Sequence, residues 1–408
     1  MLKYLYMRRN NNIKWVIIMK KLEDVIAKVR SPFTDNFIKE LIELYINADC
    51  DFHAIYDAIN KVNEENLQRN ESINTLQNVI WDRGTSIADG KWEEDSHGKS
   101  HMVYETKPVY KENGYWMVLM SNPEAFKQYE DGDPEGKNLL YRIYLNVKGK
   151  DKLDCVMGYI EECHKRGLDY KFKFSTRDGR DDEIIIQSNS EHFLENLSIV
   201  EELTKQMQLG ETPMLVGKYG NNIGVSEEYY NRLLSPTQAR IYLLGASILK
   251  YICDHSDTTM TLCTDDEKRT LNYLLTTIKL HKEEAKANQD LADELMQDPE
   301  VDAAEVTEAM EMFNLIPYAK IDNVNMYEQN IFGSSDMYTD GSFEIRKLSG
   351  LAHRMYASEP EDFLNEITSN VRYIGNNVFG ISKDMIFSVT TENNIEASKK
   401  KDTVDVDI

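Results

Sequence analysis

The spacing of apolar positions predicts helices in the first part of the chain. Between 20 and 81, apolar residues recur every three or four positions, which is the repeat of a helix that buries one face. The stretch 83–110 is rich in glycine, serine and charged residues, and we expect a long loop or an irregular β-arm there. The short apolar run at 115–120 predicts a buried strand.

The clearest pattern of the sequence predicts a strand, a helix, two strands and a helix, at 141–147, 153–167, 170–174, 183–187 and 193–203. The first strand is expected to be half-buried, with Arg142, Tyr144 and Asn146 on one face. Because a helix joins the first two strands, we expect them to be parallel neighbours with a right-handed crossover. An Asp-Gly pair between the last two strands favours a hairpin.

The remaining segments complete an α+β fold class. After a glycine-containing loop, Ser235 and Pro236 predict the start of a helix that runs to about 251. We expect a small mixed sheet with flanking helices, a helical N-terminal part and an acidic helical C-terminal extension. The expected segments are a flexible arm or misassigned start, a helical part with a loop, the core, acidic helices, an α/β part and a disordered tail, at 1–18, 19–110, 111–255, 256–314, 315–390 and 391–408.

The chain carries a net charge of −23 over 408 residues. Such a surface repels polyanions, so we expect no nucleic-acid partner and no binding to anionic membranes. No run of about 18 apolar residues occurs, so nothing in the sequence predicts a membrane span. The five cysteines form an odd set without a CxxC pair, which is typical of reduced cysteines in a cytoplasmic protein.

Basic residues concentrate between Arg142 and Arg180 of this acidic chain. That stretch holds ten basic and six acidic residues, a local balance of +4. Guanidinium groups bind phosphate oxygens in pairs and a lysine adds a point charge, so basic residues on adjacent strands predict a phosphate site. A solvated sheet face of mixed charge explains the same pattern, and composition alone leaves both interpretations open.

Short motifs within 141–251 occur in a fixed order. They are an RxYxN strand, an FK pair, an RxD turn, a PM pair before GxxIG, and a serine before an arginine-bearing helix, with the residues Arg142, Tyr144, Asn146, Phe172, Lys173, Arg180, Asp182, Pro213, Met214, Gly220, Gly224, Ser235 and Arg240. In order and spacing they resemble the HopA-type family, which includes a bacterial type III effector and the lyase components of class V lanthipeptide synthetases. The resemblance covers about 110 of the 408 residues.

The resemblance implies a phosphothreonine lyase-like fold and the β-elimination of phosphate from phosphothreonine or phosphoserine. It implies no metal and no organic cofactor. Lys173 is then the base, and the phosphate contacts are Arg142, Lys171, Arg180, Lys218 and Arg240. Tyr144 occupies the position where the phosphothreonine lyases carry a histidine that acts as the general acid, so Tyr144 becomes the candidate acid.

The implied substrate is a phosphorylated peptide or protein, in a bacterial cytoplasm or in a host cytosol. A separate kinase would supply it, because the sequence contains neither a kinase glycine loop nor an HRD motif. One alternative is a catalytically inactive effector or interaction protein that binds a partner in the same groove. Another is a subunit that binds a leader peptide. Whether the chain is an enzyme stays open.

Two further sets of residues have the types that bind metals or transfer protons. Cys253, His255 and Cys263 have a spacing that occurs in zinc sites, but a fourth ligand is missing, and packing in a helix explains them better. His97 and His101 are expected in a solvated loop.

Overall fold

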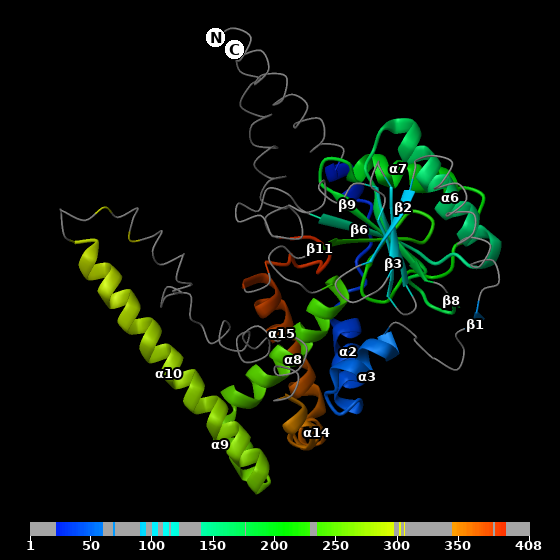
Figure 1. The fold of residues 1–408 in the computed structure, drawn as a ribbon. Helices are drawn as coiled ribbons and strands as arrows, with labels where there is room; N and C mark the ends of the chain where they lie inside the picture. Colours follow the sequence, from blue (N-terminus) through cyan, green and yellow to red (C-terminus); the bar gives the residue numbers. More distant parts are fainter. Residues whose placement is uncertain are drawn as a thin grey trace, which may run out of the picture. The chain divides into compact units, whose positions relative to one another are not determined.

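The elements expected at 141–203 are present in the computed structural model (Figure 1). They are the strands β6 (Leu140–Leu145), β7 (Lys171–Ser175) and β9 (Ile184–Asn189) and the helices α6 (Gly149–Arg166) and α7 (Phe193–Thr204). Gly167 ends α6 in the left-handed conformation, with a φ of 67°. The structure describes residues 22–59, 68–69, 90–94, 100–104, 109–113, 116–121, 140–175, 177–228, 235–297, 302, 306, 345–377 and 380–388.

The order of these strands differs from the prediction. β9 lies between β6 and β7 and pairs antiparallel with both, so β6 and β7 run in the same direction without being neighbours. The connection through α6 skips one strand position, and the hairpin that returns from β7 fills it. The expectation of parallel neighbours in a mixed sheet is therefore wrong, because all pairings between named strands in the described residues are antiparallel.

Further strands extend this sheet on both sides. They are β2 (Gly90–Glu94), β3 (Ser100–Tyr104), β4 (Val109–Asn113), β5 (Trp116–Met120), β10 (Gly217–Tyr219) and β11 (Ile223–Glu228). In the described residues the strand order is β10-β11-β6-β9-β7-β5-β4-β3-β2, and a separate pairing joins β1 (Gln68–Arg69) to β8 (Arg177–Asp178). The strand expected at 115–120 is thus confirmed as β5. The prediction of a glycine-containing loop before Ser235 is wrong, because that segment forms the β10–β11 hairpin.

Aromatic side chains attach α6 and α7 to one face of the sheet. Tyr141 of β6 stacks on Phe193 of α7 with the ring centres 4.4 Å apart. Tyr159 of α6 meets Phe172 of β7 edge to face at 5.5 Å, and its hydroxyl donates to Asn196 Oδ1 of α7 at 2.8 Å. The apolar sides of β6, β7 and β9 therefore form the core with these two helices, and the opposite face carries the polar side chains.

The chain divides into two compact units, and each is discontinuous in the sequence. The first comprises Met1–Phe33, Tyr56–Ala239 and Asp384–Ile408, and the second comprises Thr34–Ile55 and Arg240–Lys383. These units differ from the consecutive segments expected from composition, because packing joins segments that are far apart in the chain. The arm expected at 1–18 and the tail expected at 391–408 lie outside the described residues.

The second unit is built from helices. They include α2 (Asp35–Asn47), α9 (Ser256–Leu262), α10 (Asp265–Leu295), α14 (Ser349–Ser358) and α15 (Pro360–Asn377), while α3 (Phe52–Ile59) and α8 (Pro236–Asp254) contribute residues to both units. Ser235 caps α8 as expected, because its Oγ accepts a hydrogen bond from Gln238 N at 3.3 Å. Tyr251 of α8 packs edge to face on Phe363 of α15 at 4.8 Å.

An α/β part was expected at 315–390, but the named elements among the described residues of that range are the helices α14 and α15. The buried residues Phe363, Ile367, Val371 and Ile374 follow a spacing of three and four positions, which is a helical repeat. The named elements in this range are therefore helical, and the rest of the expected α/β part lies outside the described residues.

The acidic helix was predicted correctly over the range of α10. Thr264 and Glu267 form a reciprocal capping box at its start. Leu271, Leu274 and Ile278 form a buried stripe in the first half of α10, whereas Tyr273, Leu280 and Leu291 are exposed. Among the described residues, no helix combines the length and apolar character needed to cross a membrane. None of the five cysteines forms a disulfide bond.

Candidate functional site

The pairing register places four of the predicted site residues on one face of the sheet. Tyr144 of β6 is opposite Ile185 of β9, and Ile185 is opposite Lys173 of β7. In the adjacent row, Arg142, Gln187 and Lys171 are aligned in the same way. Side chains that are directly opposite each other share a face. We call the face that carries Arg142, Tyr144, Lys171 and Lys173 the polar face.

The spacing of the strands sets the width of this site. Neighbouring strands lie about 4.8 Å apart, so Cα atoms two strands apart, such as those of Tyr144 and Lys173, are about 10 Å apart. Ile185 of β9 lies between these two residues. The predicted alternation in the two strands is thereby confirmed, but the functions of these residues remain a proposal.

The polar face is more deeply buried than expected. Arg142 is 8% exposed and Tyr144 is 3% exposed, whereas Lys171 and Lys173 are partly exposed. The prediction of a half-buried β6 is therefore wrong. Its physical reason is a small apolar cluster of Tyr144, Ile185 and Val216, against which Trp116 packs.

Trp116 of β5 brings two cations together at the edge of this cluster. The Nζ atom of Lys173 lies 4.4 Å from the centre of the indole ring, and the Cζ atom of Arg180 lies 4.9 Å from it. Contacts of this kind attract a cation to the electron-rich ring face. The sequence predicted only a buried strand at Trp116 and missed this function, because the cation–π contacts depend on the β5–β7 pairing.

Arg180 is held by a carboxylate on its own loop. Its Nε donates to Asp182 Oδ1 at 2.8 Å, and its Nη2 donates to Asp182 Oδ2 at 3.3 Å. Burial lowers the pKa of Arg180, but the paired Asp182 outweighs burial and the net shift is upward. The guanidinium therefore stays charged, and this fork uses two of its five N–H groups.

A buried network fixes the loop that carries Arg180. Glu183 Oε1 accepts hydrogen bonds from the backbone N–H groups of Gly179 and Arg180, at 2.8 and 2.9 Å. Glu183 Oε2 pairs with Lys152 Nζ of α6 at 2.5 Å, and Lys152 Nζ also lies 2.7 Å from Asp178 Oδ1. The loop is thus anchored on the helix beneath the sheet.

Tyr144 contacts β11 through its hydroxyl and its ring. Ser226 Oγ donates a hydrogen bond to Tyr144 Oη at 3.2 Å. A Cβ atom placed on Gly224 would approach Tyr144 Cβ to 2.9 Å, so a glycine is needed opposite the tyrosine. The last glycine of the GxxIG motif therefore leaves the space that the Tyr144 side chain occupies.

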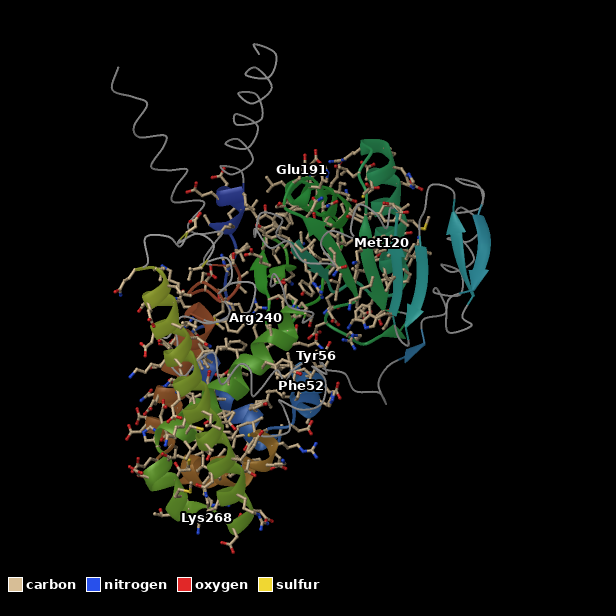
Figure 2. The ribbon with its side chains drawn as sticks, turned by 60° about the vertical axis from the view of Figure 1, so that its left-hand side comes forward. Phe52, Tyr56, Met120, Glu191, Arg240 and Lys268 are labelled. Atoms are coloured by element: carbon tan, nitrogen blue, oxygen red, sulfur yellow. The ribbon has the colours of Figure 1, made fainter. Side chains whose placement is uncertain are left out.

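Tyr56 is a second tyrosine of the first unit that interacts with charged residues of this site, and no pattern in the sequence pointed to it. It lies in the last turns of α3 (Figure 2). Burial raises its pKa, and Asp182 raises it further, while Arg180 and Arg142 act in the opposite direction. Tyr56 thus belongs to the electrostatic surroundings of Arg142 and Arg180.

One predicted phosphate contact, Lys218, lies apart from this group within the sheet. Lys218 is exposed on β10, four strands away from Lys173 in the sheet order. Arg240 is in the second unit, on α8 (Figure 2), and is 2% exposed. The order of the motifs along the chain did not predict the position of Lys218 in the sheet.

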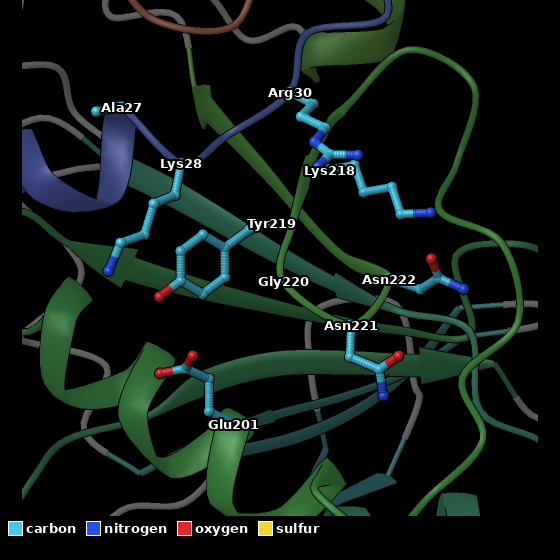
Figure 3. Close-up of a pocket in the computed structure, with 9 residues that line it drawn as sticks. All are labelled: Ala27, Lys28, Arg30, Glu201, Lys218, Tyr219, Gly220, Asn221 and Asn222. Carbon is cyan, nitrogen blue, oxygen red and sulfur yellow. The ribbon is translucent and has the colours of Figure 1, made fainter.

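Lys218 lines a separate cavity of about 810 Å³ at the edge of the sheet, together with Ala27, Lys28, Arg30, Glu201, Tyr219, Gly220, Asn221 and Asn222. Figure 3 shows Lys28, Tyr219 and Glu201 on one side of this cavity and Arg30 and Lys218 on the other. The cavity thus contains three cations and one carboxylate.

The metal-type residues of the sequence do not come together. His255 Nδ1 lies 3.0 Å from Tyr251 O, and Cys263 Sγ donates to Thr259 O at 3.2 Å. In the part of the chain that the structure describes, no three histidine, cysteine or carboxylate side chains are arranged to hold a metal ion. His101 is in β3 opposite Glu93, and His97 lies outside the described residues.

Comparison of the chain with models of known protein families and with curated proteins gives no match.

Proposed function

We propose that the chain binds a phosphorylated threonine or serine side chain on the polar face and eliminates the phosphate to leave a dehydroamino acid. The observation that carries this proposal is the alignment of Arg142 with Lys171 and of Tyr144 with Lys173 in adjacent rows of one face. Arg180 contacts the same Trp116 ring as Lys173, and we propose that it also binds the phosphate. A phosphothreonine lyase-like core is part of the same proposal.

In the proposed step, Lys173 removes the proton from Cα of the phosphorylated residue. The electron pair left on Cα forms a double bond to Cβ, the bond between Cβ and the phosphate oxygen breaks, and phosphate leaves. A base must start as the neutral amine, so Lys173 has to lose its own proton before it can accept the proton from Cα. The step requires no metal and no organic cofactor.

Tyr144 is the proposed acid that protonates the leaving phosphate oxygen. Giving up its proton leaves a phenolate, and the hydrogen bond that Ser226 donates to Tyr144 Oη stabilises that negative charge. Arg142, Lys171 and Arg180 offset the charge of the phosphate as it leaves. The substrate is a peptide or protein that a separate kinase has phosphorylated, as in lanthipeptide maturation.

One observation favours a second function, which is phosphopeptide binding without elimination. Tyr144 is 3% exposed and packs in an apolar cluster with Ile185 and Val216, an arrangement that also suits a purely structural tyrosine. In that case Arg142, Lys171 and Arg180 hold the phosphate of a partner, and the chain acts as an inactive effector or interaction protein.

Incubation with a phosphothreonine peptide separates the two functions. Mass spectrometry should detect the loss of phosphoric acid with the wild type and none with Lys173→Ala. Lys150→Ala, which changes an exposed lysine in the first turn of α6, should keep the activity. Binding of an intact peptide would support the second function. A chain that neither binds nor converts the peptide would contradict both.

A further inference from the structure

The cavity at the edge of the sheet is connected with the polar face by the pairing register. Lys218 of β10 is opposite Gly224 of β11, and Gly224 is opposite Tyr144. On the outer side of β10, Arg30 pairs with Lys218 in an antiparallel bridge. Arg30 and Lys218 therefore extend the row that contains Tyr144 and Lys173, on the same face of the sheet.

Arg30 and Lys218 are two like charges directly opposite each other. Such a pair is destabilising unless an anion lies between them. Both side chains are exposed, and within the described residues neither forms an ion pair or a side-chain hydrogen bond. Only backbone atoms form their bridge: Arg30 N–H donates to Lys218 O at 2.8 Å, and Lys218 N–H donates to Arg30 O at 2.9 Å. The arrangement thus leaves two cationic groups available to a ligand.

The rest of the cavity also favours an anion. Lys28 adds a third cation, and the single carboxylate, Glu201, interacts with Tyr219. Burial raises the pKa of Tyr219, and the hydrogen bond to Glu201 raises it further, so this hydroxyl stays protonated as a donor to Glu201. In a chain of net charge −23, an acidic ligand is attracted only where cations gather locally.

We infer that Arg30 and Lys218 bind acidic side chains of the same phosphopeptide that the polar face binds, an inference that rests on the proposed function. The Cα atoms of Tyr144 and Lys218 are two strand spacings apart, or about 10 Å, and Arg30 lies one spacing further. An extended peptide advances about 3.3 Å per residue. Acidic residues about three and four positions from the phosphorylated residue therefore reach Lys218 and Arg30. Lys218 reads the peptide sequence instead of holding the eliminated phosphate.

Binding of fluorescent peptides tests this inference. Each peptide carries α-methylphosphoserine, which lacks the Cα proton and cannot undergo elimination. One peptide has glutamates three and four positions before this residue, one has them after it, and one has glutamines on both sides. A fourth peptide has the glutamates on both sides but carries an unphosphorylated serine. Fluorescence anisotropy at low salt gives the dissociation constants.

One of the two acidic phosphopeptides should bind about five- to tenfold more tightly than the glutamine peptide, since an exposed pair contributes up to about fivefold. The Arg30→Gln/Lys218→Gln variant should lose this preference but still bind the glutamine phosphopeptide. Lys150→Gln, which removes one exposed charge elsewhere, should keep the preference. Equal melting temperatures would show that the variants are folded.

Other outcomes separate the inference from the proposed function. If phosphopeptides bind and both acidic peptides equal the glutamine peptide, or if the double variant keeps the preference, the inference is wrong and the proposed function stands. If the phosphate adds nothing to binding, the proposed function fails. Charge-dependent binding of the unphosphorylated peptide that disappears in the double variant would then leave only an acidic-peptide site at Arg30 and Lys218.

Discussion

Lys152 and Glu183 form an ion pair of 2.5 Å beneath the sheet, with side-chain exposures of 1% and 0%. The pair joins α6 to the loop that carries Arg180, because Glu183 also accepts the N–H groups of that loop. A buried ion pair contributes little net stability, but a buried charge left alone is costly. Lys152 and Glu183 therefore hold the loop of Arg180 in place. Removal of either partner is expected to destabilise the fold.

Lys152→Met should destabilise the fold by about 3–5 kcal/mol, because it leaves the buried Glu183 carboxylate without its cation. Burial already raises the pKa of Glu183, with Lys152 acting in the opposite direction, so the variant should drive Glu183 towards its protonated form. Urea denaturation followed by circular dichroism gives the change. The neighbouring Lys150→Met should shift the midpoint little, and an equal shift in both variants would contradict a special function of Lys152.

Strand periodicity carried most of what the sequence predicted about the site. Alternation placed Arg142 with Tyr144 and Lys171 with Lys173, and the pairing register joins these pairs on one face. Periodicity reports which residues share a face of one strand. It does not report what covers that face, so the burial of Tyr144 by Val216 and Trp116 was not predicted.

The strand order and the β10–β11 hairpin were beyond the reach of local patterns. The position of β9 between β6 and β7 depends on pairings between segments that are distant in sequence. The hairpin was mistaken for a loop because Gly217, Gly220 and Gly224 interrupt the apolar alternation. Two of these glycines leave room for neighbours instead, since Cβ atoms would meet Val29 at Gly217 and Tyr144 at Gly224.

Gly224→Ala should destabilise the first unit by about 1–3 kcal/mol and displace Tyr144. The added Cβ would lie 2.9 Å from Tyr144 Cβ and 3.0 Å from Val216 Cγ2, which leaves no direction for relief. Thermal unfolding measures the cost. Ser226→Ala is the matched control on the same face of β11, because it removes the hydroxyl contact without adding bulk. A neutral Gly224→Ala would show that β11 can move away from β6.

Trp116→Leu should weaken phosphopeptide binding severalfold, because Lys173 and Arg180 lose the aromatic surface that positions them. Trp116→Phe keeps a ring and should retain much of the affinity. Titration with a peptide that carries α-methylphosphoserine gives both dissociation constants. If leucine and phenylalanine reduce the affinity equally, the indole acts only through packing.

The pKa of Asp51 makes the second unit sensitive to acid. The hydrogen bond from Ala54 N–H, 2.9 Å long, lowers this pKa most, and Arg346 lowers it further. A carboxylate with a lowered folded pKa contributes stability that is present above its unfolded value of about 3.9 and is lost as the pH falls through the folded value.

Asp51→Ala should therefore cost about 1 kcal/mol at neutral pH, and the difference from the wild type should shrink below about pH 4. Melting temperatures measured along a pH series test this. Asp51→Asn keeps a side-chain oxygen that can accept the hydrogen bond from Ala54 N–H at the start of α3. This variant should lose the pH-dependent part of the stabilisation and retain most of the rest. A difference between Asp51→Ala and the wild type that is constant with pH would rule out the carboxylate charge.

Tyr144→Phe should separate elimination from binding, because it removes the proposed proton donor and leaves the ring in its cluster. Loss of a general acid lowers the rate by about 10²–10⁴-fold, so elimination should fall by that factor while affinity for the phosphopeptide changes little. Single-turnover mass spectrometry gives the rate, and anisotropy gives the affinity. Ser226→Ala, which removes only the hydrogen bond to the phenolate, should produce a smaller loss of rate in the same direction. If Tyr144→Phe keeps the full rate, Tyr144 is not the acid. Tyr56, which interacts with Arg142 and Arg180, would then be the next tyrosine to replace by phenylalanine.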